Sequence, residues 1–241
     1  MPRYVLTGAP GAGKTAILRL LEQAGHQVVE EAATDVIARE QSLGSRQPWT
    51  SPGFTDAVVT LQRQREERVI DGAARAIFVD RSPVCTLALA RQLRSPVSAL
   101  LQAEVDRVVA ERVYAGVFFV RNLGFVEPTA ARRISFEESL AFEKLHERTY
   151  RELGFELIEV PAGPLPWRVA QVCAAAGLPA PVLGRPASDL RRRSDEGADA
   201  GDSASDDQRV DLPGALVGVD GLGVRDEPAD LLVEQDAVPA E

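Results

Sequence analysis

The sequence predicts an α/β fold, a three-layer sandwich in which a mostly parallel, five-stranded sheet carries helices on both faces. Short apolar segments alternate with segments of helical periodicity throughout the first 177 residues. Hydrophobic residues make up 45% of the 241-residue chain, which is enough for a sizeable core. Charge is nearly balanced up to residue 187, with 22 basic and 21 acidic residues, so this part of the chain is close to neutral.

Five short segments are expected to form the strands of this sheet. Most are uninterrupted runs of branched and aromatic residues, as is typical of strands that are buried on both faces. The predicted strands cover residues 4–6, 26–30, 77–80, 115–120 and 155–160.

The segments between these strands have the length and spacing of amphipathic helices. One helix has a clear start, because Ser135 and Glu138 have the spacing of a capping box. The same helix is expected to end before Gly154, since glycine commonly terminates helices. The predicted helices cover residues 13–24, 34–42, 55–75, 84–93, 97–113, 135–153 and 166–176.

The chain divides into a folded domain over residues 1–178 and an acidic tail, rich in proline and glycine, over residues 179–241. From residue 188 onward there are 15 acidic residues against five arginines. The stretch 191–207 has no large apolar residue, so we expect disorder there. Residues 212–219 are apolar but rich in glycine, and a short docking segment is the alternative to disorder. The acidic tail is a candidate site for a protein partner.

Composition excludes several classes of protein. A net charge of −9 argues against a nucleic-acid-binding protein held by bulk electrostatics. No apolar run approaches the roughly 18 residues that a membrane span needs, and the N-terminus has no signal-peptide pattern. The only cysteines, Cys85 and Cys173, exclude a disulfide scaffold and suit a reducing cytoplasm. Lys14 and Lys144 are the only lysines, against 25 arginines, a bias typical of a GC-rich bacterial genome.

The strongest motif matches G-x-x-x-x-G-K-[ST] at every position, after a predicted strand and at the start of a helix. Its backbone N–H groups and the helix N-terminus are suited to cradle phosphates. Lys14 would place a charge on the β- and γ-phosphates, and the Thr15 hydroxyl would bind Mg²⁺. A glycine-rich turn with a chance lysine is the alternative. The predicted site for ATP or GTP consists of Gly8, Ala9, Pro10, Gly11, Ala12, Gly13, Lys14 and Thr15.

A second motif, Asp80-Arg81-Ser82, follows the predicted strand 77–80. At the end of a strand, Asp80 would face the phosphate loop and hold Mg²⁺ or accept a proton from a substrate hydroxyl. Arg81 would hold a substrate or a phosphate. The alternative is a helix N-cap, because Asp and Ser are both favoured there.

A third motif is the arginine pair Arg132-Arg133, which precedes a predicted helix. Small-molecule kinases need mobile cations that close over the γ-phosphate and exclude water, and this pair fits such a lid. A solvated basic turn that pairs with Glu137 or Glu138 is the alternative.

These motifs, in this order, resemble a group of bacterial predicted ATPases that carry an AAA label but are closer to ribosylnicotinamide kinase and nucleotide kinases. The resemblance covers residues 3–172. It implies a P-loop kinase fold, ATP or GTP with Mg²⁺, and an acidic residue after the second strand that faces an acceptor. The motifs that carry the resemblance are the phosphate loop, Glu30-Glu31-Ala32, Pro48-Trp49, Phe78 to Ser82, the arginine pair and Tyr150 to Gly154.

In this chain the acidic residue would be Glu30 or Glu31. Because neighbouring residues on a strand point to opposite faces, at most one of them faces the cleft, and a plain strand end is the alternative. Trp49 would stack on an acceptor or pack, and packing is favoured. His26 and His146 are expected at the surface. The arginine finger and sensor arrangement of ring-forming AAA motors is not evident, so the label does not imply a hexamer.

Two functions from different classes remain open at this point. One is a kinase that moves the γ-phosphate to a small-molecule hydroxyl, or hydrolyses ATP, with Lys14, Asp80, Arg81, Arg132 and Arg133 as its catalytic residues. The other is a nucleotide-dependent switch that is read by a partner and needs only the phosphate loop and a sensing loop. The residue pattern leaves open the acceptor and the choice between ATP and GTP.

Overall fold

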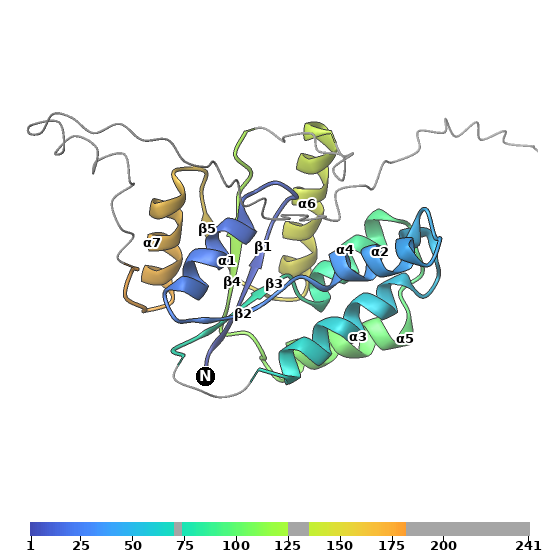
Figure 1. Cartoon of the computed structure of the whole chain (residues 1–241), viewed down its shortest axis with the longest axis horizontal. Helices are drawn as coiled ribbons and strands as arrows, with labels where there is room; N and C mark the ends of the chain where they lie inside the picture. The colour runs from blue at the N-terminus through green and yellow to red at the C-terminus, as the bar shows by residue number, and fades with distance from the viewer. Residues whose placement is uncertain (70–73, 125–134, 182–241) are drawn as a thin grey trace, which may run out of the picture.

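The computed structural model describes residues 1–69, 74–124 and 135–181 (Figure 1). Over this part of the chain a five-stranded sheet has the order β2-β3-β1-β4-β5, and every neighbouring pair is parallel. The predicted α/β fold with a parallel five-stranded sheet is therefore confirmed. The strands are β1 (Arg3–Thr7), β2 (Gln27–Val29), β3 (Ile77–Asp80), β4 (Gly116–Val120) and β5 (Leu157–Val160).

The helices follow the predicted order, with ends that shift by a few residues in most cases. The predicted helix 55–75 is too long, because α3 ends at Glu67 and residues 74 and 75 are not helical. The capping box at Ser135 and Glu138 is present at the start of α6. The helices are α1 (Lys14–Gln23), α2 (Ala32–Ser42), the short 3-10 helix η1 (Pro48–Thr50), α3 (Phe54–Glu67), α4 (Pro83–Gln92), α5 (Ala99–Ala110), α6 (Phe136–Glu152) and α7 (Leu165–Ala175). None of these helices is long and apolar enough to cross a membrane.

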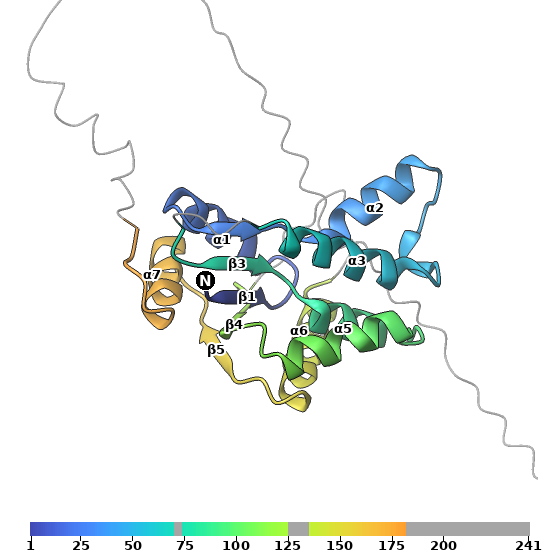
Figure 2. The same cartoon turned by 90° about the horizontal axis from the view of Figure 1, so that it is seen from below.

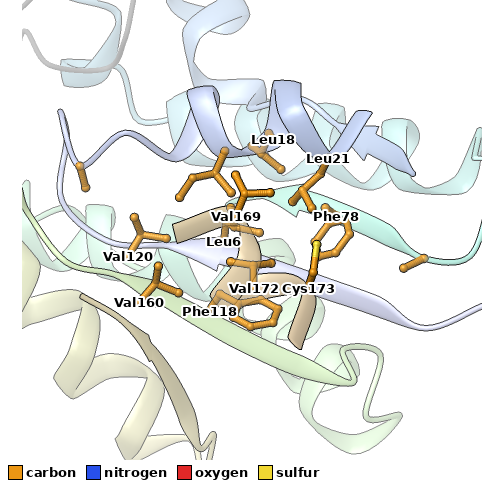
Figure 3. Close-up of a cluster of buried hydrophobic side chains, with 13 residues drawn as sticks. Leu6, Leu18, Leu21, Phe78, Phe118, Val120, Val160, Val169, Val172 and Cys173 are labelled. Carbon is orange, nitrogen blue, oxygen red and sulfur yellow. The ribbon is translucent and has the colours of Figure 1, made fainter. Parts of the chain in front are cut away.

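Successive side chains of the strands point to opposite faces of the sheet, and this divides the core into two layers. Leu6, Phe78 and Phe118 face α1 and α7, in the cluster shown in Figure 3. Val5 and Val117 face the opposite way and pack with residues of α4, α5 and α6. Figures 1 and 2 show the same division, with α1 and α7 on one side of the sheet and α6 on the other.

Helices α2, α3, α4 and α5 form a group beside the sheet (Figure 1). A third apolar cluster joins α2 and α3 to α4 and α6 and includes Phe54, Leu89 and Phe142. Trp49 packs against this cluster and is partly buried, in agreement with the expectation that it packs. Helices α2 and α4 of this group begin shortly after β2 and β3, at the carboxyl ends of these strands, where ligands of parallel sheets bind.

Candidate active site

The loop between β1 and α1 has a backbone that its glycines make possible. Gly8 has a φ of 132°, and a Cβ atom there would lie 2.2 Å from the carbonyl oxygen of Val120. Gly13 has a φ of 83° and precedes α1 without a side-chain cap. The amides of the first helical turn are therefore not used by a capping side chain, which leaves them suited to bind an anion.

Lys14 folds back over this loop and is buried. Its Nζ donates to the carbonyl oxygens of Ala9, at 2.8 Å, and Gly8, at 3.2 Å. Thr15 follows in the first turn of α1 and is partly buried. Both predicted phosphate-loop side chains thus lie at the junction of β1 and α1.

A buried arginine from the other end of the domain supports the same loop. Arg168, in α7, is 2% exposed and donates through Nη1 to the carbonyl oxygen of Ala12 at 2.6 Å. Its Nη2 donates to the carbonyl oxygen of Arg121 at 2.8 Å. Arg168 could not be predicted as part of the site, because nothing in its local sequence distinguishes it from a solvated helical arginine.

Asp80 ends β3 directly beside β1, where it pairs in register with Leu6. The side chain is buried, and among the described residues no group hydrogen-bonds to Oδ1. Burial and the charge of Glu31 raise the pKa of Asp80 to about 6, against the opposing charges of Lys14 and Arg81. An ionised carboxylate there has an open coordination position on an oxygen, as a Mg²⁺ ligand must have.

The described residues include no cluster of three or more His, Cys, Asp or Glu side chains that could hold a metal. A Mg²⁺ ion at this edge of the sheet would therefore need oxygens besides those of the protein. This fits the usual Mg²⁺ site of nucleotide-binding proteins, in which one or two protein oxygens, water and phosphates share the ion. Asp80 and Thr15 are the residues that would contribute.

Arg81 turns the chain sharply after β3. Its φ of 69° lies in the left-handed region, which is uncommon for residues other than glycine. Its Nε lies 2.5 Å from Oε1 of Glu31, at the start of α2. Glu31 also accepts from Thr34 Oγ1 at 3.0 Å. Glu30 and Glu31 are the two residues predicted to face the phosphate acceptor. Glu31 contacts Arg81, whereas Glu30 is exposed.

A narrow pocket lies between the phosphate loop and helices α2, α3, α4 and α6. Its walls are mostly apolar, and its polar groups include the Glu31–Arg81 pair and the amide of Gln62. The lining residues are Pro10, Glu31, Ala32, Ala33, Val58, Gln62, Arg81, Ser82, Cys85, Thr86, Leu89 and Phe142.

The amide of Gln62 is held from behind by a buried carboxylate. Gln62 Nε2 lies 3.4 Å from Oε1 of Glu66, which also accepts from the Tyr114 hydroxyl at 3.0 Å and pairs with Arg3 at 3.5 Å. An ionised carboxylate can only accept hydrogen bonds, so the Gln62 nitrogen faces Glu66. Burial raises the pKa of Glu66, although these three donors favour its charged form.

Both histidines are buried, so the expectation of surface positions is wrong. His26 lies edge-on against the ring of Phe78, with centroids 5.4 Å apart. His146, in α6, is fully buried, and its Nε2 lies 3.3 Å from Nη1 of Arg81. Both histidines were expected to be exposed to solvent, but elements that are distant in the sequence pack over them and bury them.

The hydroxyl of Tyr150, from α6, lies 2.6 Å from Ser82 Oγ and 3.2 Å from Cys85 Sγ. The Ser82 hydroxyl also accepts from the Val84 amide and so caps α4. The N-cap alternative for the Asp80-Arg81-Ser82 motif therefore applies to Ser82. Arg132 and Arg133, the predicted lid, lie outside the described residues.

A family model described as an AAA domain matches residues 3–168 of the chain. The chain belongs to this AAA-domain family. No curated protein matches it. The match covers the phosphate loop, Asp80, Arg81, Glu31 and, at its last residue, Arg168.

Among solved structures, the NadR protein in complex with NR is similar to this AAA-domain protein with a TM-score of 0.57 and 17% identity, over 76% of this chain and 53% of that chain. The NadR protein in complex with NAD and AMP-PNP gives the same TM-score and identity, over 52% of its own length. Deoxyadenosine kinase from M. mycoides with bound dATP has a TM-score of 0.49 at 15% identity, over 73% of this chain and 100% of that chain. This chain spans about half the length of NadR, and the likeness to NadR shows a shared fold.

Proposed function

We propose that this AAA-domain protein is a phosphotransferase that moves the γ-phosphoryl group of ATP or GTP to a hydroxyl of a small molecule. The observation that carries the proposal is the pocket beside the phosphate loop, in which Pro10 of the loop and the Glu31–Arg81 pair line one cavity. A switch needs a site for nucleotide only. Transfer between two substrates also requires a site for the acceptor, and the pocket beside the phosphate loop would supply that site.

The phosphate loop would bind the triphosphate. Its backbone amides and the N-terminus of α1 would contact the phosphate oxygens, and Lys14 would move from the carbonyls of Gly8 and Ala9 to the β- and γ-phosphates. The binding of AMP-PNP, an ATP analogue, by NadR supports this choice of ligand. Mg²⁺, when bound, would neutralise charge on the β- and γ-phosphates. Thr15 and Asp80 would orient their oxygens toward that position.

The acceptor would lie in the pocket with its hydroxyl near Glu31 and Arg81. The carboxylate of Glu31 would accept a hydrogen bond from the hydroxyl and orient it for in-line attack. Arg81 would donate to the acceptor or to the transferring group, where negative charge accumulates. The apolar walls and the Gln62 amide favour an acceptor with a mostly apolar body and one polar edge.

The lid stays a proposal that rests on sequence alone. Arg132 and Arg133 would close over the γ-phosphate and exclude water, which would suppress hydrolysis in favour of transfer. Their simultaneous replacement by alanine is expected to spare nucleotide binding and to lower turnover.

The experiment that tests the proposal incubates the purified protein with Mg²⁺ and [γ-³²P]ATP or [γ-³²P]GTP, with and without a mixed metabolite extract. Transfer of label to a new small molecule that depends on the extract and is lost in Lys14→Ala supports the kinase. Release of inorganic phosphate alone, unaffected by the extract, indicates a hydrolase. Tight nucleotide binding with neither reaction contradicts the proposal and favours a switch that a protein partner reads.

A further inference from the structure

The guanidinium of Arg81 is contacted from two sides by separate helices. Glu31, at the start of α2, lies 2.5 Å from Nε, and His146, in α6, lies 3.3 Å from Nη1. Arg81 itself is in the left-handed region, with a φ of 69°, so its backbone is strained rather than relaxed. The contacts with Glu31 and His146 restrict the direction in which the guanidinium points.

The contacts of His146 determine which tautomer the ring adopts. Its Nδ1 lies 3.0 Å from the carbonyl oxygen of Phe142, and a carbonyl can only accept a hydrogen bond. The proton of a neutral ring is therefore on Nδ1, and Nε2 carries a lone pair. The guanidinium of Arg81 has only donors, so it donates to this lone pair.

The surroundings of the ring also favour the neutral form. His146 is fully buried and lies edge-on to the Phe142 ring, with centroids 4.2 Å apart. The charged groups that act on it are both cations, Arg81 before α4 and Lys14 in the phosphate loop, and together with burial they lower its pKa to about 3. A protonated ring would have no acceptor for Arg81 and would repel it.

We propose that His146 is a positioning residue, whose neutral Nε2 accepts a hydrogen bond from Arg81 and fixes the plane of its guanidinium at the pocket. The negative charge of Glu31 attracts the guanidinium of Arg81, and the lone pair on His146 Nε2 sets the orientation of that guanidinium. Helix α6 also lines the pocket through Phe142. The same helix therefore forms one wall of the pocket and sets the orientation of Arg81. The role of Arg81 in transfer rests on the proposed function, whereas the hydrogen bond itself does not.

Two substitutions separate this role from simple packing. His146→Asn keeps an amide near the Phe142 carbonyl but removes the acceptor at the position of Nε2. His146→Gln is longer and brings a carbonyl oxygen to about that position. We expect His146→Asn to lower kcat/KM for transfer by about 10- to 100-fold, the range of one hydrogen bond to a charged group, with the nucleotide Kd unchanged. His146→Gln is expected to recover most of the activity. Equal losses in both variants would overturn the proposal.

A spectroscopic measurement tests the hydrogen bond without any acceptor. The chain has only two histidines, so a long-range ¹H–¹⁵N spectrum of the imidazoles contains two ring systems, and His26→Phe assigns them. We expect His146 to show the Nδ1–H tautomer from pH 8 down to about pH 5, and Arg81→Met to shift the Nε2 resonance. An Nε2–H tautomer, a protonated ring at pH 6, or an unchanged Nε2 resonance in Arg81→Met would overturn the proposal. If no variant, including the wild type, transfers phosphate, the proposed function fails while this spectrum still decides the role of His146.

Discussion

Arg168 and Ala12 lie 156 residues apart in the chain, yet the guanidinium of one donates to the carbonyl oxygen of the other at 2.6 Å. A second donor of the same guanidinium reaches the carbonyl oxygen of Arg121, at the end of β4. Arg168 thus connects the phosphate loop to the central sheet from behind, on the side away from the pocket. The loop is therefore supported by a residue of α7 that lies far from it in the sequence.

We predict that Arg168→Met weakens ATP binding by about tenfold or more, because two buried carbonyl groups lose their charged donor and the loop loses its support. The folded state should also be less stable, by about 2 kcal/mol. Isothermal titration calorimetry with the non-hydrolysable analogue AMP-PNP, paired with urea unfolding, measures both quantities. Arg148→Met is the control, since Arg148 is an exposed arginine of α6. An unchanged Kd in Arg168→Met would show that the loop holds its shape unaided.

The two lysines of the chain allow a matched test of the phosphate loop. Lys14 is buried against the loop, whereas Lys144 is exposed on α6. We expect Lys14→Met to abolish measurable nucleotide binding, because the β- and γ-phosphates would lose their cation. Lys144→Met should bind as the wild type does. Equilibrium binding of a fluorescent ATP analogue compares the two, and equal affinities would contradict the assigned site.

Asp80 is predicted to lower the stability of the ligand-free protein at neutral and higher pH. Its pKa rises from 3.8 to about 6 on folding, so the folded state binds more protons than the unfolded state between these values. The contribution of Asp80 to the free energy of unfolding therefore falls as pH rises through that window, by about 1.4 kcal/mol for each unit of pKa difference. Asp80→Asn should remove the penalty.

The measurement is thermal unfolding of the ligand-free Asp80→Asn and wild-type proteins at pH 8 and pH 4. We expect a higher midpoint for the variant at pH 8 and a much smaller difference at pH 4, together with loss of Mg²⁺-dependent turnover. Glu22→Gln is the control, because Glu22 is an exposed carboxylate of α1 that does not act on the pKa of Asp80. A lower midpoint for Asp80→Asn at pH 8 would mean that the charge of Asp80 stabilises the fold.

Tyr150→Phe tests the buried contact between α6 and α4. The Tyr150 hydroxyl lies 2.6 Å from Ser82 Oγ and 3.2 Å from Cys85 Sγ. Its removal deprives both side chains of this hydrogen-bonding partner. We expect a loss of about 1–2 kcal/mol in the free energy of unfolding by urea. Tyr4→Phe is the matched control, since the Tyr4 hydroxyl makes one partly buried bond of 3.3 Å and should matter less. Equal effects would show that the Ser82 contact adds nothing.

Much of the fold could be predicted because it depends on local pattern. Apolar runs and glycine turns identified all five strands, and the spacing of Ser135 and Glu138 identified the start of α6. The end of α3 was missed, because Val69 and Ile70 continue the helical spacing of apolar residues in the sequence, whereas the helix ends at Glu67.

The candidate site divides in the same way. The phosphate-loop motif is local, because its glycines, lysine and threonine lie within eight residues, so the sequence by itself determined where the loop is. The family resemblance limited the residue expected to face an acceptor to Glu30 or Glu31. Only the tertiary structure placed Glu31 against Arg81, turned His146 from an expected surface residue into a buried partner of Arg81, and brought Arg168 to Ala12. These side chains come from helices that pack on opposite faces of the sheet. Which of their polar groups are buried together is decided by that packing, because a polar residue carries no local mark of the partner that will satisfy it.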